Sequence, residues 1–361
     1  MAAASIALAM YYDKEMEPML KEDLTQLFRD GRFNRDKHEL WKLIEMVAVE
    51  KLEFLPDLLK IRVSKLIRPI HLEARRWIRD HDCLLNISAA NCYLTYKSIL
   101  CWKTDGRIDG IKTAKKLVQD KNIDAKIRFA LACTYFLEDE VLALWYGDNE
   151  VNKKNILLNG SNRAMRFWMR YLKSGSWRKK SWKAMINRYF KSPIFRRSDI
   201  RIKVSCFFPY LSWEGKKNYF PHLQSLDKIH DDDFRLCMQA MDERECMELC
   251  CADPARSLYC CLEWPLQSLF MEMARQLWMH MNANQFHAVL DRIVLWYILE
   301  GVEDFDYVGL LKEFWRLIPA SFKDEIKKIK KYFVPIDVAL NYDKENTSLS
   351  LPETLEEYVR K

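Results

Sequence analysis

Six of the eleven cysteines lie between residues 237 and 261, and thiolates are common ligands of structural zinc. Cys246 and Cys250 are four residues apart, so a helix would place them on one face, with Cys260 and Cys261 beyond. Structural zinc usually takes paired Cys-x2–4-Cys knuckles, and the segment has no such pair of knuckles. The odd total and the long chain argue against a disulfide framework. We interpret these residues as buried, reduced thiols, with zinc as the alternative.

Carboxylates and histidines offer little more chemistry. Asp231, Asp232 and Asp233 precede a predicted helix, so at least one is interpreted as a capping residue, with a metal site as the alternative. His280 and His287 are seven residues apart, but residues 282–285 interrupt the predicted helix between them. The sequence has no G-x-G-x-x-G, P-loop, H-E-x-x-H or G-x-S-x-G motif. It therefore predicts a non-enzymatic protein with no catalytic residue, metal or cofactor.

Residues 163–203 hold 14 lysines and arginines against one acidic residue, Asp199, in a chain whose net charge is +7. Interleaved aromatic residues suit a segment that tracks phosphates and stacks bases, or one that lies on an anionic membrane surface. The interpretation that we favour is a solvated basic face whose aromatics are core, because Phe167 and Tyr171 have helical spacing. For the nucleic-acid alternative, the predicted binding residues are Arg166, Arg170, Arg178, Lys179, Lys180, Arg196 and Arg197.

The composition indicates which elements must position these residues. Apolar residues make up 49% of the chain, enough for a sizeable core, and Gly 9 and Pro 11 are low counts that disfavour an all-β fold. The sequence predicts a nearly all-α chain, with helices over residues 58–67 and 72–78 separated by Pro69, and a polar linker after Pro335. No apolar run is long enough for a membrane span, and no signal peptide is evident, so a cytoplasmic or nuclear location is expected.

The stretch from Asp124 to Trp145 is predicted to be a buried helix that organises the chain. Apolar residues cover nearly all its sides, Asp124 suits an N-cap and Gly147 a stop. Parts of the pattern recur after 75, 105 and 162 residues, for example at Ile202, Phe234 and Tyr297. The irregular spacing indicates an irregular helical repeat, and chance similarity between amphipathic helices is the alternative.

Two segments resemble known families. Residues 129–133, followed by Val141 and Leu144, resemble the helix pair of an ankyrin repeat, although Phe136 and Leu137 replace its turn glycine and histidine. Residues 349–359 resemble the closing segment of a SOCS box, without its second proline. The fitting residues are Leu351, Pro352, Leu355 and Tyr358. The elongin-binding helix that such a box requires would begin at Leu311, with Trp315 in place of the expected cysteine.

These resemblances imply an α-solenoid-like, degenerate ankyrin-like array that binds proteins. Ankyrin repeats followed by a SOCS box form a known arrangement in substrate-recruiting adaptors of cullin-type ubiquitin ligases, whose partners are elongin B and C. The expected division is an N-terminal helical region (1–82), a helical-repeat region (83–319) and a basic helix with a polar, SOCS-like tail (320–361). Nucleic-acid or acidic-partner binding through residues 163–203 is the alternative function.

Overall fold

The computed structural model describes residues 2–26, 35–85, 97–147, 162–175, 179–190, 200–220, 230, 232–328, 330–343 and 349–359. Within these ranges every regular element is a helix and no strand occurs, and isolated bridge residues are found at Trp102, Ile108 and Ile202. The predicted all-α class is therefore confirmed. In the same ranges, no helix combines the length and the apolar character that crossing a membrane requires.

The chain forms two compact units. Unit 1 is discontinuous and consists of residues 1–71 and 250–361, and unit 2 consists of residues 72–249. The three-part division that the sequence predicts, into residues 1–82, 83–319 and 320–361, remains a prediction.

The first part of unit 1 begins with α1 (Ala2–Tyr11), α2 (Glu17–Gln26) and α3 (Arg35–Lys51). The long helix α4 (Asp57–Leu85) starts in unit 1 and ends in unit 2. Short turns around Pro56 separate α3 from α4.

Pro69 does not separate two helices, because α4 runs through it without a break. This prediction is wrong because local sequence rules omit packing. A proline inside a helix costs roughly 3 kcal/mol, whereas each large apolar side chain that is fully buried contributes about 1.5–3 kcal/mol. Side chains at helical spacing on both sides of Pro69 are buried: Val63, Leu66, Ile67, Ile70, Ala74, Trp77 and Ile78.

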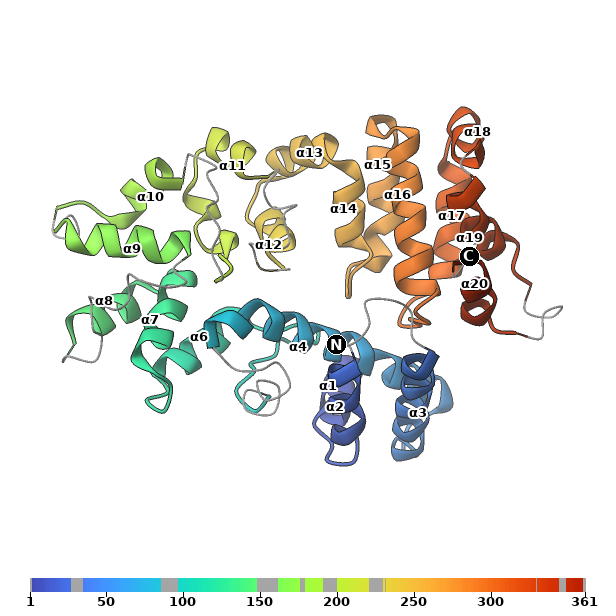
Figure 1. Ribbon diagram of the computed structural model, residues 1–361, viewed down its shortest axis with the longest axis horizontal. Coiled ribbons are helices and arrows are strands. Elements are labelled where there is room, and N and C mark those ends of the chain that lie inside the picture. The colour runs from blue at the N-terminus through green and yellow to red at the C-terminus, as the bar shows by residue number, and fades with distance from the viewer. Residues whose placement is uncertain are drawn as a thin grey trace. The chain divides into compact units, whose positions relative to one another are not determined.

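The second part of unit 1 is a succession of helices. They are α14 (Pro254–Cys261), α15 (Phe270–Leu277), α16 (Ala283–Ile293), α17 (Tyr307–Leu317), α18 (Ala320–Lys328), α19 (Lys330–Asn341) and α20 (Leu351–Val359). Single turns η6 (Gln267–Leu269) and η7 (Trp278–His280) flank α15, and the π-helix η8 (Val294–Ile298) extends α16. Each helix from α14 to α17 contacts the helix two places further along, so α14 meets α16 and α17 meets α19 (Figure 1).

Pro335 lies inside α19, so the prediction that the chain becomes a polar linker after it is wrong as far as Asn341. The neighbouring Ile336 and Ala339 are fully buried, and this burial explains why the helix continues. By contrast, the interruption predicted near residue 282 is confirmed. Asn282 and Gln285 form a capping box that starts α16.

A buried polar contact joins the two parts of unit 1. The guanidinium of Arg68 on α4 donates a 2.9 Å hydrogen bond from Nη1 to the carbonyl oxygen of Gly301 and lies over the ring of Trp41. The nearby Asp23 carboxylate accepts from the indole of Trp41 at 2.9 Å and lies 3.1 Å from His71 Nε2. Arg68, Asp23 and His71 are all at most 4% exposed, so the buried Arg68 cation and the buried Asp23 carboxylate depend on such polar neighbours for compensation.

Unit 2 contains the remaining elements. They are α6 (Gly110–Gln119), α7 (Ala125–Thr134), α8 (Glu138–Tyr146), α9 (Arg163–Lys173), α10 (Trp182–Phe190), η3 (Val204–Cys206), η4 (Phe208–Tyr210), α11 (Trp213–Tyr219) and α12 (Asp233–Gln239). Helix α13 (Glu243–Ala252) ends in unit 1.

The stretch predicted as one organising helix is a pair of helices, α7 and α8. Asp124 is the N-cap of α7, accepting from Lys126 N at 2.7 Å, and Gly147 is the C-cap of α8, so both predicted ends are confirmed. Between the helices, Phe136 adopts a left-handed conformation with φ 53°. Such a turn favours glycine, and the aromatic packing of the Phe136 ring compensates for the strain.

Phe136 is the centre of the aromatic core of unit 2. Its ring centroid lies within 5.9 Å of those of Phe167, Trp168, Trp182, Phe190 and Phe207. These rings come from α7–α8, α9, α10 and the segment after η3, so one side chain at a helix turn holds several elements together.

The predicted recurrences of this stretch have different structures. The one after 105 residues coincides with another helix pair, α12 and α13. The one after 75 residues falls on the short 3-10 turns η3 and η4, and the one after 162 residues falls on the π-helix η8 and the turn that follows it. The observed class is thus all-α, with a helix pair at two of the predicted positions.

Gly301 is expected to resist substitution because the first atom of any side chain would meet a buried ring. It has φ +61°, and a Cβ there would overlap Cε1 and Nδ1 of His38, which is only 7% exposed. We expect Gly301→Ala to destabilise the protein by about 3 kcal/mol, combining backbone strain with overpacking. Thermal and urea unfolding followed by circular dichroism measure the effect.

The matched control is Gly175→Ala. Gly175 has a similar φ of +64°, but nothing among the described residues lies within 4 Å of the Cβ position. This variant should lose only the strain, about 1 kcal/mol. Equal losses in the two variants would contradict the proposed clash with His38.

Candidate functional site

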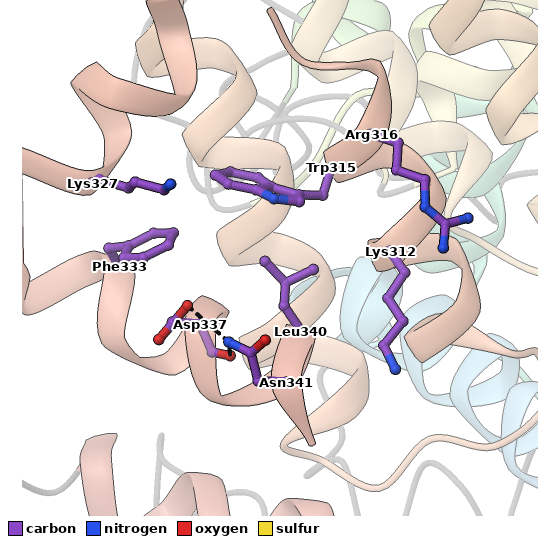
Figure 2. Close-up of a pocket in the computed structure, with 8 residues that line it drawn as sticks. All are labelled: Lys312, Trp315, Arg316, Lys327, Phe333, Asp337, Leu340 and Asn341. Carbon is purple, nitrogen blue, oxygen red and sulfur yellow. Dashed lines mark hydrogen bonds between the residues drawn. The ribbon is translucent and has the colours of Figure 1, made fainter. Parts of the chain in front are cut away.

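A pocket of about 360 Å³ lies between α17, α18 and α19 in unit 1 (Figure 2). Helix α17 contributes three residues that share a face at i, i+3 and i+4, and α19 contributes a second face at i, i+4, i+7 and i+8. The lining residues are Lys312, Trp315 and Arg316 from α17, Lys327 from α18, and Phe333, Asp337, Leu340 and Asn341 from α19. The volume falls within the usual range of small-ligand and side-chain pockets.

The pocket combines an aromatic wall with a cationic rim. The rings of Trp315 and Phe333 face the same space with centroids 5.7 Å apart, and Lys327 reaches that space from α18 (Figure 2). Asp337 contributes the single carboxylate, and its Oδ1 accepts from Asn341 Nδ2 at 3.0 Å. Among the described residues, Lys312, Arg316 and Lys327 form no ion pair, so the pocket has an excess of positive charge.

The six residues predicted to bind a partner lie in and beside this region. Trp315 lines the pocket, but Leu311 on the same helix is fully buried, as are Leu355 and, nearly, Leu351 on α20. Pro352 is half-buried, and Tyr358 is 44% exposed. Helix α20 packs on α19, which in turn contacts α17.

Helix α20 is capped at its N-terminus by Ser350 and Glu353. The hydroxyl and backbone N–H of Ser350 both donate to Glu353 Oε2, at 2.6 and 2.8 Å, and Leu351 and Leu355 form its buried face. The far end of the helix leaves Tyr358 and Val359 exposed. In this chain Leu351 and Leu355 therefore stabilise the helix packing, and Tyr358 is the exposed residue among the six predicted to bind a partner.

The basic segment divides into buried rings and exposed cations. Phe167, Trp168, Tyr171, Trp182 and Phe190 are at most 3% exposed, so these rings are core and do not offer faces for base stacking. Arg170, Lys179 and Lys180 are exposed, whereas Arg166 is half-buried. Arg178, Arg196 and Arg197 lie outside the described residues.

The cysteines do not gather into a metal site within the described residues. The ten described cysteines are free of disulfide bonds, and no group of them lies close enough to hold a metal ion. Burial raises the pKa of Cys261 to about 12 and that of Cys237 well above its ordinary value, which keeps both thiols protonated. Neither His280 nor His287 joins a metal-binding group there.

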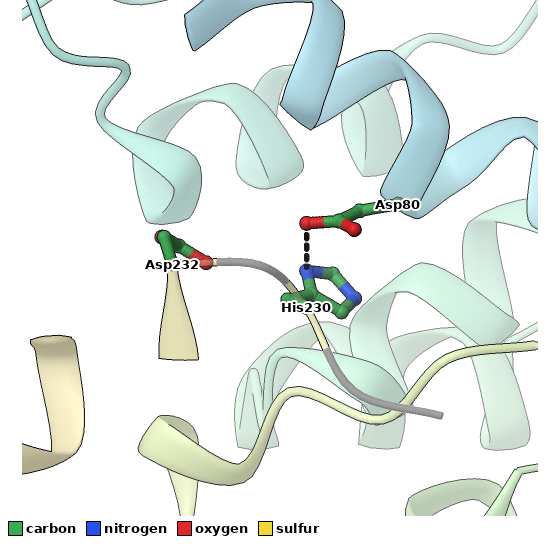
Figure 3. Close-up of side chains that lie close together, drawn as sticks. All are labelled: Asp80, His230 and Asp232. Carbon is green, nitrogen blue, oxygen red and sulfur yellow. Dashed lines mark ion pairs between the residues drawn. The ribbon is translucent and has the colours of Figure 1, made fainter. Parts of the chain in front are cut away.

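Asp80, His230 and Asp232 come together in unit 2, with ligand atoms within 4.8 Å of one another (Figure 3). Asp80 lies on α4, His230 follows the η3–α11 segment in sequence, and Asp232 is at the N-terminus of α12. Each carboxylate already has a cation: Arg201 Nη1 donates to Asp80 Oδ1 at 2.7 Å, and Lys203 Nζ to Asp232 Oδ1 at 2.7 Å. Asp231, the first of the predicted aspartate run, lies outside the described residues.

Lys203 and Asp233 extend this cluster into a network. Asp233 accepts from the backbone N–H groups of Val204 and Ser205 and, at 2.7 Å, from the Ser205 hydroxyl, so it caps η3. Burial raises the pKa of Asp233 to about 6 despite Lys203 nearby. Burial alone would lower the pKa of Lys203, but the carboxylates of Asp232 and Asp233 outweigh it and hold that pKa well above the ordinary value.

The histidines in the network are neutral. Burial lowers the pKa of His81 to about 3 and that of His230 well below its ordinary value. His81 Nδ1 lies 2.6 Å from the carbonyl oxygen of Trp77, so Nδ1 carries the proton and Nε2 accepts from the Tyr135 hydroxyl at 2.9 Å. His81, His230 and Asp233 are at most 2% exposed, so this network joins α4, α7, η3 and α12 rather than facing a substrate.

Sequence reasoning finds Trp315 and misses the rest of the pocket. Its other wall residues, Phe333 and Leu340, fall on the helix that continues past Pro335, where the sequence predicts a linker. The signal is the spacing of Phe333, Asp337 and Leu340 on one helix face, which becomes visible only if Pro335 is accepted inside a helix.

Comparison with models of known protein families gives no match to this chain, and comparison with curated proteins gives none either. The proposals about its function therefore rest on the geometry of the molecule.

Lys203→Met is expected to destabilise unit 2 by about 3 kcal/mol or more, because it leaves Asp232 and Asp233 buried without their cation. The loss should be largest above about pH 6, where both carboxylates are charged, and should shrink as the pH falls and protonation relieves the repulsion. Urea unfolding at pH 7.5 and pH 5 tests both statements.

Lys217→Met is the control, because the pair that Lys217 forms with Glu248 is at the surface, with side chains 40% and 48% exposed. It should change the free energy of unfolding by at most about 1 kcal/mol at either pH. If the two variants behave alike, Lys203 is not an essential part of the network.

Proposed function

We propose that the protein is a non-enzymatic, stacked-helix scaffold that acts as a substrate-recruiting adaptor of a cullin-type ubiquitin ligase. The observation that carries the proposal is the form of the C-terminal segment. Helix α20 is capped and docked through Leu351 and Leu355, while Tyr358 and Val359 remain exposed at its end. An exposed aromatic residue on a rigid, preorganised helix is the kind of anchor that partner binding uses.

Two further features support a scaffold. The contacts of each helix from α14 to α17 with the helix two places further along suit stacking, and the helix pairs α7–α8 and α12–α13 suit degenerate ankyrin-like repeats. Large apolar side chains are also exposed near the start of α4: Phe54, between α3 and α4, is 73% exposed, and Leu58, in the first turn of α4, is 83% exposed. Such residues often mark protein interaction sites.

Co-purification with elongin B and C tests the adaptor proposal. The full chain should retain the complex, and a chain that ends at Ser348 should lose it, because the truncation removes α20. Tyr358→Ala should weaken retention about tenfold, the effect of losing one aromatic anchor.

Glu357→Ala is the matched control for Tyr358→Ala, since Glu357 is the exposed neighbour on the same helix. Its retention should equal that of the wild type. If neither the full chain nor its variants retain elongin B and C, the adaptor proposal is overturned, and the scaffold proposal then depends on the other surfaces.

The second candidate function is binding of a polyanion, such as nucleic acid, through α9 and α10. The observation that favours it is a one-sided charge distribution. Arg170, Lys173, Lys179, Lys180, Lys183 and Arg188 are exposed, and neither helix contains an acidic residue. With the neighbouring aromatic rings buried, recognition would rest on phosphates rather than on stacked bases.

For this candidate, replacing Arg170, Lys179 and Lys180 by Glu should abolish retention on immobilised DNA or RNA. If three phosphate contacts are lost, the slope of log affinity against log salt should also fall by about 3. Lys112, Lys121 and Lys126 are exposed cations of the same unit, and their replacement by Glu is the control for net charge. Unchanged retention of the first variant would sink this candidate.

A further inference from the structure

The pocket between α17, α18 and α19 has features that the adaptor proposal does not use. Its wall is formed by the rings of Trp315 and Phe333 with the side chain of Leu340, and its rim by Lys312, Arg316 and Lys327 (Figure 2). Apolar walls with a few charged groups at the edge are typical of sites that seat one side chain or one small group.

Charge distinguishes this pocket from an ordinary gap between helices. Three cations and one carboxylate line the pocket, and that carboxylate is engaged by the amide of Asn341 at 3.0 Å. A fourth cation, Lys323, has its ammonium 5.4 Å from the centre of the Trp315 ring. Within the described residues none of the three rim cations has an ion-pair partner, so an anionic ligand would supply the missing compensation.

The apolar wall adds a second requirement. The rings of Trp315 and Phe333 pack on each other, with centroids 5.7 Å apart. A purely ionic ligand would leave the exposed surface of this pair in water, whereas a large apolar side chain packed against the pair would cover it. Aromatic and Arg residues around a pocket are also the residue types that carry most of the energy of protein recognition. The ligand that matches both requirements is an apolar side chain flanked by carboxylates.

We propose that this pocket binds an acidic peptide segment of a partner protein, with a large apolar side chain of the segment packed against the ring pair of Trp315 and Phe333. Carboxylates of the segment pair with Arg316, Lys327 and Lys312. The proposal goes beyond the adaptor function and does not depend on it, because elongin binding is tested on α20 and this pocket is tested with a peptide.

The test is isothermal titration calorimetry of the full chain with the peptide Glu-Glu-Leu-Phe-Glu-Glu, blocked at both ends and unlabelled. Binding is expected with a dissociation constant on the order of 100 µM at about 0.1 M salt. It should weaken at least tenfold at about 1 M salt, where the Debye length falls from about 10 Å to about 3 Å. Two comparison peptides separate the requirements: Glu-Glu-Gly-Gly-Glu-Glu lacks the anchor, and Lys-Lys-Leu-Phe-Lys-Lys reverses the charge.

The variant Arg316→Glu with Lys327→Glu reverses two rim charges at exposed positions, so the fold should survive, as unfolding curves will verify. It should bind the acidic peptide at least tenfold more weakly. The control, Lys21→Glu with Lys328→Glu, changes the net charge equally at exposed positions of the same unit that do not line the pocket, and it should stay within about threefold of the wild type.

Three outcomes would overturn the proposal. One is the absence of binding by the wild type at millimolar peptide. Another is equal weakening of the pocket variant and its control, which would indicate a response to net charge alone. The third is equal binding of the acidic peptide and either comparison peptide, which would show that the pocket selects for neither the anchor nor the charge.

Discussion

The buried guanidinium of Arg68 is the constraint on which unit 1 depends. Burial alone lowers the pKa of this group, and the carboxylates of Glu300, Asp23 and Glu45 favour its charged form. Its hydrogen bond to Gly301 spans 233 positions of sequence, so the cation is satisfied only when the two parts of the unit meet correctly. A buried charge without its partners typically costs several kcal/mol, and this cost disfavours other pairings of the same helices.

The same interaction also affects neighbouring acids. Burial and the carboxylate of Glu303 raise the pKa of Glu45 to about 7, against the opposing influence of Arg68 and Lys65. Burial likewise raises the pKa of Asp304 to about 6. In both cases the folded protein holds a proton more tightly than the unfolded chain, so each group favours folding less as the pH rises from about 4 towards 7. The contact between the two parts of unit 1 thus involves the Arg68 cation and two acids, Glu45 and Asp304, that are partly protonated.

Features that depend on a few neighbouring residues could be predicted from the sequence. The helical class, the cap at Asp124, the stop at Gly147 and the interruption at Asn282 all follow from such local patterns, and the spacing of Phe167 and Tyr171 correctly favoured core aromatics. Features that depend on distant contacts could not. Pro69 and Pro335 stay inside helices because of tertiary burial, and the pocket needs three helices and two faces to exist. Of the pocket residues, only Trp315 was predicted from the sequence to bind a partner, and it was predicted as part of an elongin-binding helix rather than of a pocket.

The discontinuity of unit 1 has a consequence for biosynthesis. Residues 1–71 leave the ribosome first, but the segment that completes their core begins at residue 250. At about 5–20 residues per second, translation of the intervening unit 2 takes roughly 10 to 40 seconds. Through that interval the helices that complete unit 1 have not been made, so they cannot yet cover Trp41, Ile44 and the apolar face of α4. Unit 2, by contrast, is contiguous and can fold as it emerges. The nascent N-terminal helices are therefore expected to expose apolar surface during translation, which is the condition that chaperones relieve.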